Sequence, residues 1–466
     1  MASKMRNCDL SGGGSTANRW LLAAATWCVL LLPLALMYAR AIGDGVLSVI
    51  ALLFLIRSVA IRSWGWLQAP WTRLMLVFWV WLMFCTWLMG APHTLVQAAA
   101  SVRFFVFVAA LETWVLSCPV TQRRLWWVVL GSTVWILIEC WQQYIFGTNE
   151  IGWPRFGDGA LTGPFRGPTA GGTYLLLFFP AFLPICFTLL QRGKLIDKFA
   201  VALVLTFAAA TMILIGQRMP ALLMALGLIV SGLLFRQVRL PVILAVLVSV
   251  AVLALLPVIS PPVFEKLVVH FTEQMWHFWG TPYGLIFGRA VSMIQAHPWV
   301  GLGWDGFRNN CMNPSYLVGL VWLPVSDPTS PLGCNIHPHN DWLLIATDAG
   351  IVGVGLFAAL VVLWLKRIGG VIGAPASGRR AGLLVIIFVT MWPIASATSL
   401  FTVPNAGWIF LMIGWGLAEA RSGLAGGSEF LGRHQDSVLP IIGQIPVSGE
   451  HHSRAGMTRT LPGILT

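Results

Sequence analysis

The stretch "GCNIHPHNDWLL" gathers ionisable and amide side chains directly before a long apolar run. It contains His337, His339, Asn340 and Asp341. Two histidines and an aspartate at this spacing fit a metal-ligand pattern seen in binuclear hydrolases, which would need further ligands. The histidines could instead belong to a structural cap of the following helix, with Asn340 or Asp341 as its N-cap. A third interpretation is a general base, because a neutral imidazole can take a proton from a hydroxyl at about pH 7.

A second group with chemical potential consists of basic residues that stand apart from the other basic clusters. They are Arg40, Arg103, Arg155, Arg166, Arg218, Lys266, Arg289 and Arg308. Arginine carries a permanent charge on a planar fork that suits phosphate oxygens, so this set indicates a lipid phosphate or diphosphate ligand. Arg218 could equally be an interface residue that extends its charged head toward the lipid surface. Arg289 could equally be a solvated charge on a helix face. Arg103 is predicted to pair with Glu139, because both lie at a similar depth in neighbouring apolar runs.

The elements that must position these residues are membrane helices. The chain has 466 residues, of which 57% are hydrophobic and only 10% charged, and its apolar runs are about twenty residues long. We therefore predict an all-α polytopic membrane protein with about 12 transmembrane helices. The predicted spans are 20–39, 43–61, 74–92, 95–117, 125–146, 172–190, 199–217, 219–235, 240–259, 341–365, 382–400 and 404–420.

Orientation follows from the basic residues, which cluster in alternate connections and resist translocation. Residues 1–19 are predicted to be a cytoplasmic tail, and 421–466 a cytoplasmic, disordered one. Residues 20–259 hold spans one to nine and 341–420 hold spans ten to twelve. Residues 260–340 form a large periplasmic loop, in which two apolar patterns predict helices, the second ending at His297-Pro298. The turn "GLGWDGF" lacks the lysine and preceding strand of a phosphate-binding loop.

Cysteine usage and net charge add two expectations. Cys311 and Cys334 both fall in the outer loop, where oxidising conditions favour a disulfide, although two unpaired thiols are the alternative. The net charge of +12 would elsewhere suggest nucleic acid. Here the excess of basic residues in cytoplasmic segments accounts for most of it, so no nucleic-acid partner is expected.

Three motifs in order, "GQRMPAL", "FGRAVSMIQAHPWVGLGWDGFRNNC" and "CNIHPHNDWLLIATDAGIVGVGLF", carry a family resemblance. With the large loop before the tenth span and the earlier "LTGPFRGPTAGGTYL", they resemble the O-antigen ligase and polymerase superfamily of bacterial envelope glycosyltransferases. The resemblance covers roughly residues 95–365. It implies an inner-membrane enzyme that takes a glycan from undecaprenyl diphosphate on the periplasmic face and needs no metal or other cofactor.

The resemblance also implies residue roles. Arg218 and Arg289 would bind the diphosphate, and His339 would be the catalytic base, with His337 a close second. Arg166, Arg308 and Asn340 are candidates for further donor or acceptor contacts. The chemistry agrees, since a donor with a good leaving group needs its developing charge neutralised and its nucleophile deprotonated.

The first hypothesis for the function is an inverting O-antigen ligase whose acceptor is a hydroxyl of the lipid A core oligosaccharide. Its partners would then be the lipid-linked donor, this acceptor and membrane lipids. An O-antigen or exopolysaccharide polymerase and a protein O-oligosaccharyltransferase are alternatives within the superfamily. A secondary transporter or flippase is the alternative from another class, but such proteins usually show two related halves with polar groups near the midplane.

Overall fold

The computed structural model describes residues 16–316, 333–370, 377–395 and 399–438, and within them the chain is helical. The first six long helices are α2 (Thr16–Tyr38), α3 (Arg40–Ala60), α4 (Pro70–Met89), α5 (Pro92–Ala100), α6 (Val102–Ala110) and α7 (Pro119–Phe146). They are followed by α8 (Ala170–Leu190), α9 (Leu195–Ile215), α10 (Arg218–Leu234), α11 (Arg239–Ile259), α16 (Asp341–Gly369), α17 (Gly378–Thr390) and α18 (Asn405–Val438). Over these ranges the structure has no strand, only an isolated bridge between Thr148 and Pro154.

Shorter elements complete the chain. Two are π-helical, η2 (Leu111–Val115) and η4 (Glu265–Val269), and four are 3-10 turns, η1 (Gly65–Gln68), η3 (Arg236–Val238), η5 (Phe278–Gly280) and η6 (Pro314–Tyr316). The segment between α11 and α16 holds α12 (Pro261–Phe264), α13 (His270–Trp276), α14 (Pro282–Ala296) and α15 (Gly306–Asn310). Both helices predicted in this segment are present, and α14 ends directly before His297 as predicted.

Nine helices of the described chain are long and apolar enough to cross a membrane, which establishes a multi-pass membrane protein. Twelve were predicted. The predicted eighth span is α10, which has 17 residues, and the predicted eleventh is α17, which has 13. At 1.5 Å per residue α17 is only about 20 Å long, short of the roughly 30 Å hydrocarbon core. The prediction of a continuous helix over 382–400 is therefore wrong.

Proline explains where α17 ends. Pro393 has no amide hydrogen, and its ring disfavours helical geometry in the residue before it. Side chains at the start of α16 hydrogen-bond the carbonyls that follow α17. Trp342 Nε1 donates to the carbonyl of Met391 at 3.1 Å. Asn340 Nδ2 donates to the carbonyl of Pro393 at 2.7 Å and to that of Ala395 at 3.3 Å. Irregular backbone in a membrane protein persists where such partners satisfy it.

Helix α16 is also interrupted, at Gly350, whose φ of 64° and ψ of −170° are not helical. The turn "GLGWDGF" packs into this break. The amide of Ile351 donates to the carbonyl of Pro298 at 2.8 Å, and the amides of Leu302 and Gly303 donate to the carbonyls of Thr347 and Asp348. A side chain on Gly350 would collide with the backbone at Trp299, so the break requires glycine there.

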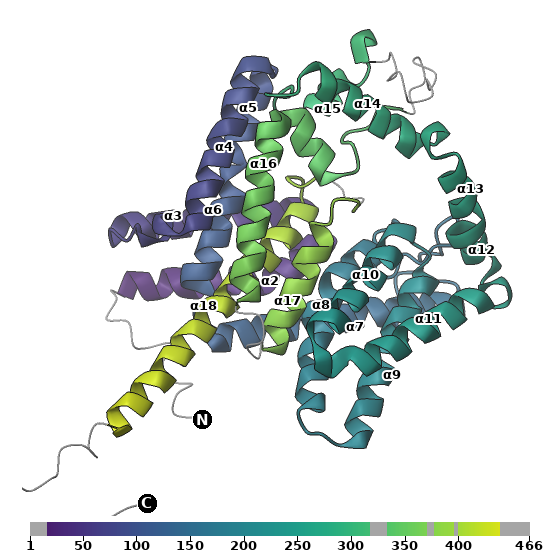
Figure 1. The fold of residues 1–466 in the computed structure, drawn as a ribbon, viewed down its shortest axis with the longest axis horizontal. Helices are drawn as coiled ribbons and strands as arrows, with labels where there is room; N and C mark the ends of the chain where they lie inside the picture. The colour runs from purple at the N-terminus through teal and green to yellow at the C-terminus, as the bar shows by residue number, and fades with distance from the viewer. Residues whose placement is uncertain (1–15, 317–332, 371–376, 396–398, 439–466) are drawn as a thin grey trace, which may run out of the picture. The chain divides into compact units, whose positions relative to one another are not determined.

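The helices pack side by side around a continuous apolar core. Helix α16 packs along α4, α17 along α8, and α9 along α11 (Figure 1). Helix α18 continues to Val438, so the prediction that the chain is irregular from residue 421 is wrong for this stretch. The predicted tail over 439–466 and the N-terminal residues 1–15 lie outside the described residues.

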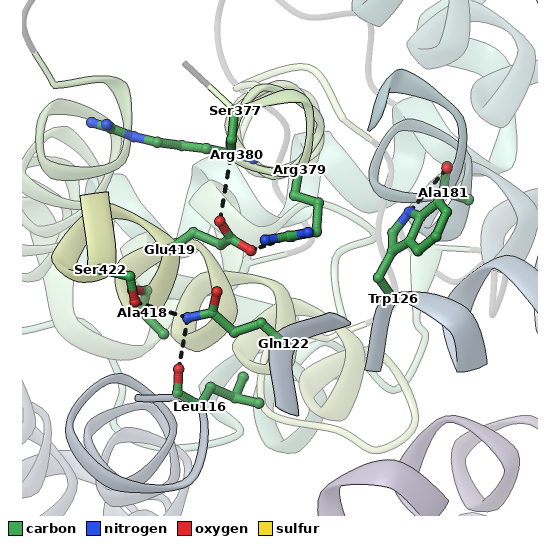
Figure 2. Close-up of polar contacts among 10 residues, drawn as sticks. All are labelled: Leu116, Gln122, Trp126, Ala181, Ser377, Arg379, Arg380, Ala418, Glu419 and Ser422. Atoms are coloured by element: carbon green, nitrogen blue, oxygen red, sulfur yellow. Dashed lines mark hydrogen bonds and ion pairs between the residues drawn. The ribbon is translucent and has the colours of Figure 1, made fainter. Parts of the chain in front are cut away.

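Polar contacts join the helices at the end of the bundle predicted to face the cytoplasm. Glu419 on α18 accepts hydrogen bonds from Arg379 and Ser377 at the start of α17, and Gln122 on α7 donates to the carbonyl of Leu116 and to Ser422 (Figure 2). Near this end Arg367 on α16 donates to the buried carboxylate of Glu112 at 2.7 Å. These ion pairs connect helices that are distant in the sequence.

Candidate active site

The histidine motif lies at the start of α16, where its geometry is defined by the helix N-terminus. Asn340 is the N-cap: its side-chain oxygen accepts a hydrogen bond from the amide of Leu343 at 2.9 Å. His339, directly before it, has a φ of 51°, in the left-handed region that only a few residue types adopt readily. Asn340 was predicted either to cap this helix or to contact a substrate, and it does cap the helix. Its side chain also hydrogen-bonds the segment after α17.

The two histidine rings lie against each other, with centroids 4.4 Å apart. His337 is buried, with 5% of its surface exposed, whereas His339 is half-buried. Nε2 of His339 lies 3.0 Å from the side-chain nitrogen of Asn335, and its ring is 5.5 Å from the ring of Tyr283. Burial lowers the pKa of His339 from its ordinary value, because desolvation penalises the charged imidazolium. The neutral ring that a general base requires is therefore favoured.

Arg218 lines an apolar groove of about 370 Å³. Helices α9, α10 and α11 form its walls, and Leu267, Val268 and Phe271 close it from the segment between α11 and α16. These three residues carry the apolar pattern from which the first loop helix was predicted. Arg218, the first residue of α10, is the only charged residue among those that line this groove.

Arg218 is held by neutral partners. Its Nε donates to the carbonyl of Lys266 at 2.7 Å, and its Nη1 donates to the side-chain oxygen of Gln274. Tyr283 is close enough to interact with it electrostatically. The ring of Tyr283 in turn lies 5.5 Å from that of His339. Among the described residues no carboxylate lies within 4 Å of Arg218, although Asp158 interacts with it electrostatically at longer range.

Two further cavities have walls that mix polar and apolar side chains, and His337 lines both. The first, of about 350 Å³, is bounded by α8, α10 and α18 and also contains Asp341. The second, of about 570 Å³, is bounded by α3, α5 and α6 and contains Arg308, which is exposed. Residues from the irregular segment after α17, including Ser399 and Thr402, line both cavities. His337 therefore borders both cavities, whereas neither histidine lines the apolar groove.

Arg289 occupies a different environment from Arg218. It is 4% exposed, and its Nη1 lies 3.3 Å from both the carbonyl oxygen of Cys311 and the sulfur of Cys334. Those two cysteines form the predicted disulfide. Arg289 lines neither the groove nor the two cavities. The structure thus brings His339 and His337 together and packs Arg289 against the disulfide.

The remaining predictions have mixed outcomes. Arg166 is exposed in the connection between α7 and α8 and lines none of these compartments. The predicted pair of Arg103 with Glu139 is wrong: Arg103 donates to Asp44 on α3 at 2.9 and 3.1 Å, because α6 packs against α3. No group of three or more His, Cys, Asp or Glu side chains in the described ranges is arranged to hold a metal ion.

Sequence reasoning missed several residues at the site. Tyr283 lies beside His339, and Asp44 lines the larger cavity together with Arg40, which the sequence had indicated. The signal for Asp44 was present, because "ARAIGDGVL" places two opposite charges four residues apart in an apolar stretch. Tyr283 carried no comparable signal, since a single tyrosine in a loop is unremarkable in type and position.

The fold and the site define a polytopic membrane protein with a histidine pair bordering two cavities and an arginine lining an apolar groove. Residues 201–358 match the family model described as O-antigen ligase, which bears out the resemblance seen in the motifs. The matched range includes Arg218, Arg289 and both histidines. Members of this family are glycosyltransferase-like ligases or polymerases. Among curated proteins, none matches the chain.

Proposed function

We propose that the chain is an inverting O-antigen ligase of a bacterial inner membrane, with its active site facing the periplasm. It transfers a glycan from undecaprenyl diphosphate to a hydroxyl of the lipid A core oligosaccharide. Two observations carry this proposal: the histidine pair borders two cavities, and Arg218 lines an apolar groove with no carboxylate of the described residues within 4 Å of it. A reaction that joins a lipid-linked donor to a sugar acceptor needs this arrangement.

The donor would lie with its polyprenyl chain in the apolar groove and its diphosphate at Arg218. Because the polyprenyl chain already lies in lipid, its contacts with leucine, valine and phenylalanine side chains contribute through packing rather than through removal from water. The guanidinium offers a charge-assisted contact to the diphosphate oxygens. As the bond between the anomeric carbon and the diphosphate breaks, negative charge develops on the leaving group, and Arg218 stabilises it there. Arg289, the other predicted diphosphate ligand, is buried against the disulfide and lines none of these compartments, so it is given no contact with the donor.

The acceptor would enter through the two cavities that His337 lines. His339 removes the proton from its hydroxyl while the oxygen attacks the anomeric carbon from the face opposite the diphosphate. One C–O bond forms, one breaks, and the electron pair leaves with undecaprenyl diphosphate, so the anomeric configuration inverts. His337 lies between His339 and the cavities and orients the acceptor. It is the alternative base, because its ring is the one that lines both cavities.

A gel of lipopolysaccharide from a deletion strain tests the class of reaction. Loss of long ladders together with accumulation of long lipid-linked glycan is the result expected of a ligase. A band carrying a single repeat on the core would instead show that the chain is a polymerase. Unchanged ladders with lipid-linked glycan trapped on the cytoplasmic side would favour a flippase.

Fusions to topology reporters test the orientation. We expect cytoplasmic signals near residues 196 and 370 and periplasmic signals near 160 and 325, because basic residues are concentrated in the connections on one side. A periplasmic signal at 370 would contradict the orientation and place the histidine motif on the wrong side of the membrane for this reaction.

A further inference from the structure

The larger of the two cavities lined by His337 holds a group of charged side chains that the mechanism above does not use. Its volume of about 570 Å³ lies within the range of roughly 300–1,000 Å³ common for ligand pockets. Arg40 comes from the start of α3, Arg103 from α6 and Arg308 from α15, so three separate elements bring guanidinium groups to one space. Asp44 and Asp305 also line it.

The three arginines differ in how they are held. Arg103 is fixed by two hydrogen bonds to the carboxylate of Asp44, at 2.9 and 3.1 Å. Arg40 and Arg308 are exposed, and neither forms an ion pair within 4 Å of any carboxylate in the described part of the chain. Three cations thus face two carboxylates, and two of the cations keep their charge-assisted hydrogen-bonding capacity. An arginine fork in this state matches phosphate and carboxylate oxygens.

The cavity is also connected to the proposed catalytic group. His337 lines it, and the ring of His337 contacts that of His339. Polar, uncharged side chains complete the wall, including Gln97, Ser101 and Thr402, which can hydrogen-bond sugar hydroxyls. A sugar bound here would have one side at the arginines and the other at the histidine pair.

We propose that this cavity is the acceptor subsite and that Arg40 and Arg308 select an anionic acceptor, a sugar bearing phosphate or carboxylate groups. The inference rests on the proposed function, because it assigns the acceptor to a cavity that the histidine pair borders. It predicts that the acceptor must carry negative charge near the hydroxyl that is glycosylated. Arg103, held by Asp44, forms part of the wall and fixes the position of α6 against α3.

Binding and turnover of the purified full-length chain test this proposal together. The binding probe is a soluble, delipidated core oligosaccharide that carries its phosphates and carboxylates, measured by calorimetry without donor. The variants are Arg40→Gln and Arg308→Gln, each on an exposed side chain whose loss should leave the fold intact. Arg192→Gln is the matched control, an exposed arginine between α8 and α9 that lines none of the three compartments.

We expect each site variant to weaken glycan binding and raise the acceptor KM by about tenfold, with donor KM and melting temperature unchanged. Glycan stripped of phosphates and carboxylates should bind wild type as weakly as intact glycan binds the variants. Equal glycan binding in all proteins would overturn the subsite, and a raised donor KM would assign the arginines to the donor. Inorganic phosphate binding as tightly as the glycan would show a free-phosphate site.

The same data separate this inference from the proposed function. If wild type binds the charged glycan through Arg40 and Arg308 but transfers nothing to it, the anionic glycan site stands and the ligase assignment fails. If transfer occurs but does not depend on acceptor charge or on these arginines, the ligase assignment stands and the subsite fails.

Discussion

The two ends of α16 place their charged groups in different surroundings. At its end, Arg367 pairs with Glu112, which is 2% exposed and also accepts a hydrogen bond from Trp71, and Arg380 donates to the carbonyl of Ile368. At its start, the histidine pair borders cavities whose exposed arginines have no carboxylate partner within the described residues. These two regions lie at opposite ends of α16, on either side of its break at Gly350.

This difference separates charges that stabilise the fold from charges available to a ligand. A buried carboxylate such as Glu112 is costly unless a cation and hydrogen bonds compensate it, so its partners are built into neighbouring helices. Arg218 at the other face is held by a carbonyl and an amide oxygen, which orient the guanidinium without neutralising it. Substitutions in the two regions should therefore have opposite signatures in stability and transfer.

The largest effect is expected for His339→Ala. Loss of a general base reduces transfer by about 10²- to 10⁴-fold, while donor binding and melting temperature stay close to wild type. His337→Ala should reduce transfer less and mainly raise the acceptor KM. Rates measured with saturating donor, together with donor-binding isotherms, check this. If His337→Ala is the more severe variant, His337 is the base and the roles are exchanged.

Arg218→Ala should reduce transfer by about a hundredfold with little loss of stability, because solvent does not replace a fork that stabilises the leaving group. Arg218→Lys should recover only part of the rate, since a single ammonium cannot make the bidentate contact. Arg239→Ala is the matched control, because Arg239 also donates to a backbone carbonyl, that of Gly232, beyond the other end of α10. Equal activity of the two alanine variants would make Arg218 an interface residue.

The pH dependence of transfer should show an acid limb that belongs to His339. Its pKa is lowered by burial, so the imidazole stays neutral below the ordinary histidine value of about 6.5 and becomes protonated only at lower pH. We expect kcat/KM to be flat through neutral pH and then to fall about tenfold per pH unit below that pKa. In the His339→Ala variant the residual kcat/KM should no longer fall at low pH. A limb that remains there would belong to another group.

The smallest effect on transfer is expected at the opposite end of α16. Arg367→Ala leaves the buried Glu112 carboxylate without its cation, which should lower the free energy of unfolding by about 1–3 kcal/mol. Transfer per folded molecule should stay within about twofold of wild type. Thermal unfolding and transfer rates of the same preparation check this, with the exposed Arg421→Ala as control. A large loss of transfer at unchanged stability would contradict the distinction between the two ends.

The sequence was sufficient for features that depend on local pattern. Apolar runs predicted most spans, the spacing of Ile286, Ala290 and Met293 predicted α14, and the position of Asn340 predicted a helix cap. Burial in lipid or core leaves such patterns directly in the sequence. The motif order was also enough to identify the family over residues 201–358.

The features that escaped prediction depend on which helices become neighbours. Arg103 and Glu139 lie at similar depth, but α6 packs against α3, so Asp44 is the partner. The break at Gly350 is stabilised by the backbone of the turn after Pro298, a contact between segments with no common pattern. Helix α17 is short because Pro393 follows it, and Asn340 at the start of α16 donates a hydrogen bond to the carbonyl of Pro393. Hydropathy alone could not distinguish such a satisfied break from a continuous span.

Glycan transfer by the purified chain tests the central claim most directly. The assay combines a defined undecaprenyl diphosphate-linked donor with core acceptor, with and without EDTA, and the product linkage is determined by NMR. The account predicts transfer with release of undecaprenyl diphosphate, inversion at the anomeric carbon and no sensitivity to the chelator. If EDTA abolishes transfer and one divalent ion restores it, the general-base mechanism is wrong. His337, His339 and Asp341 would then be metal ligands.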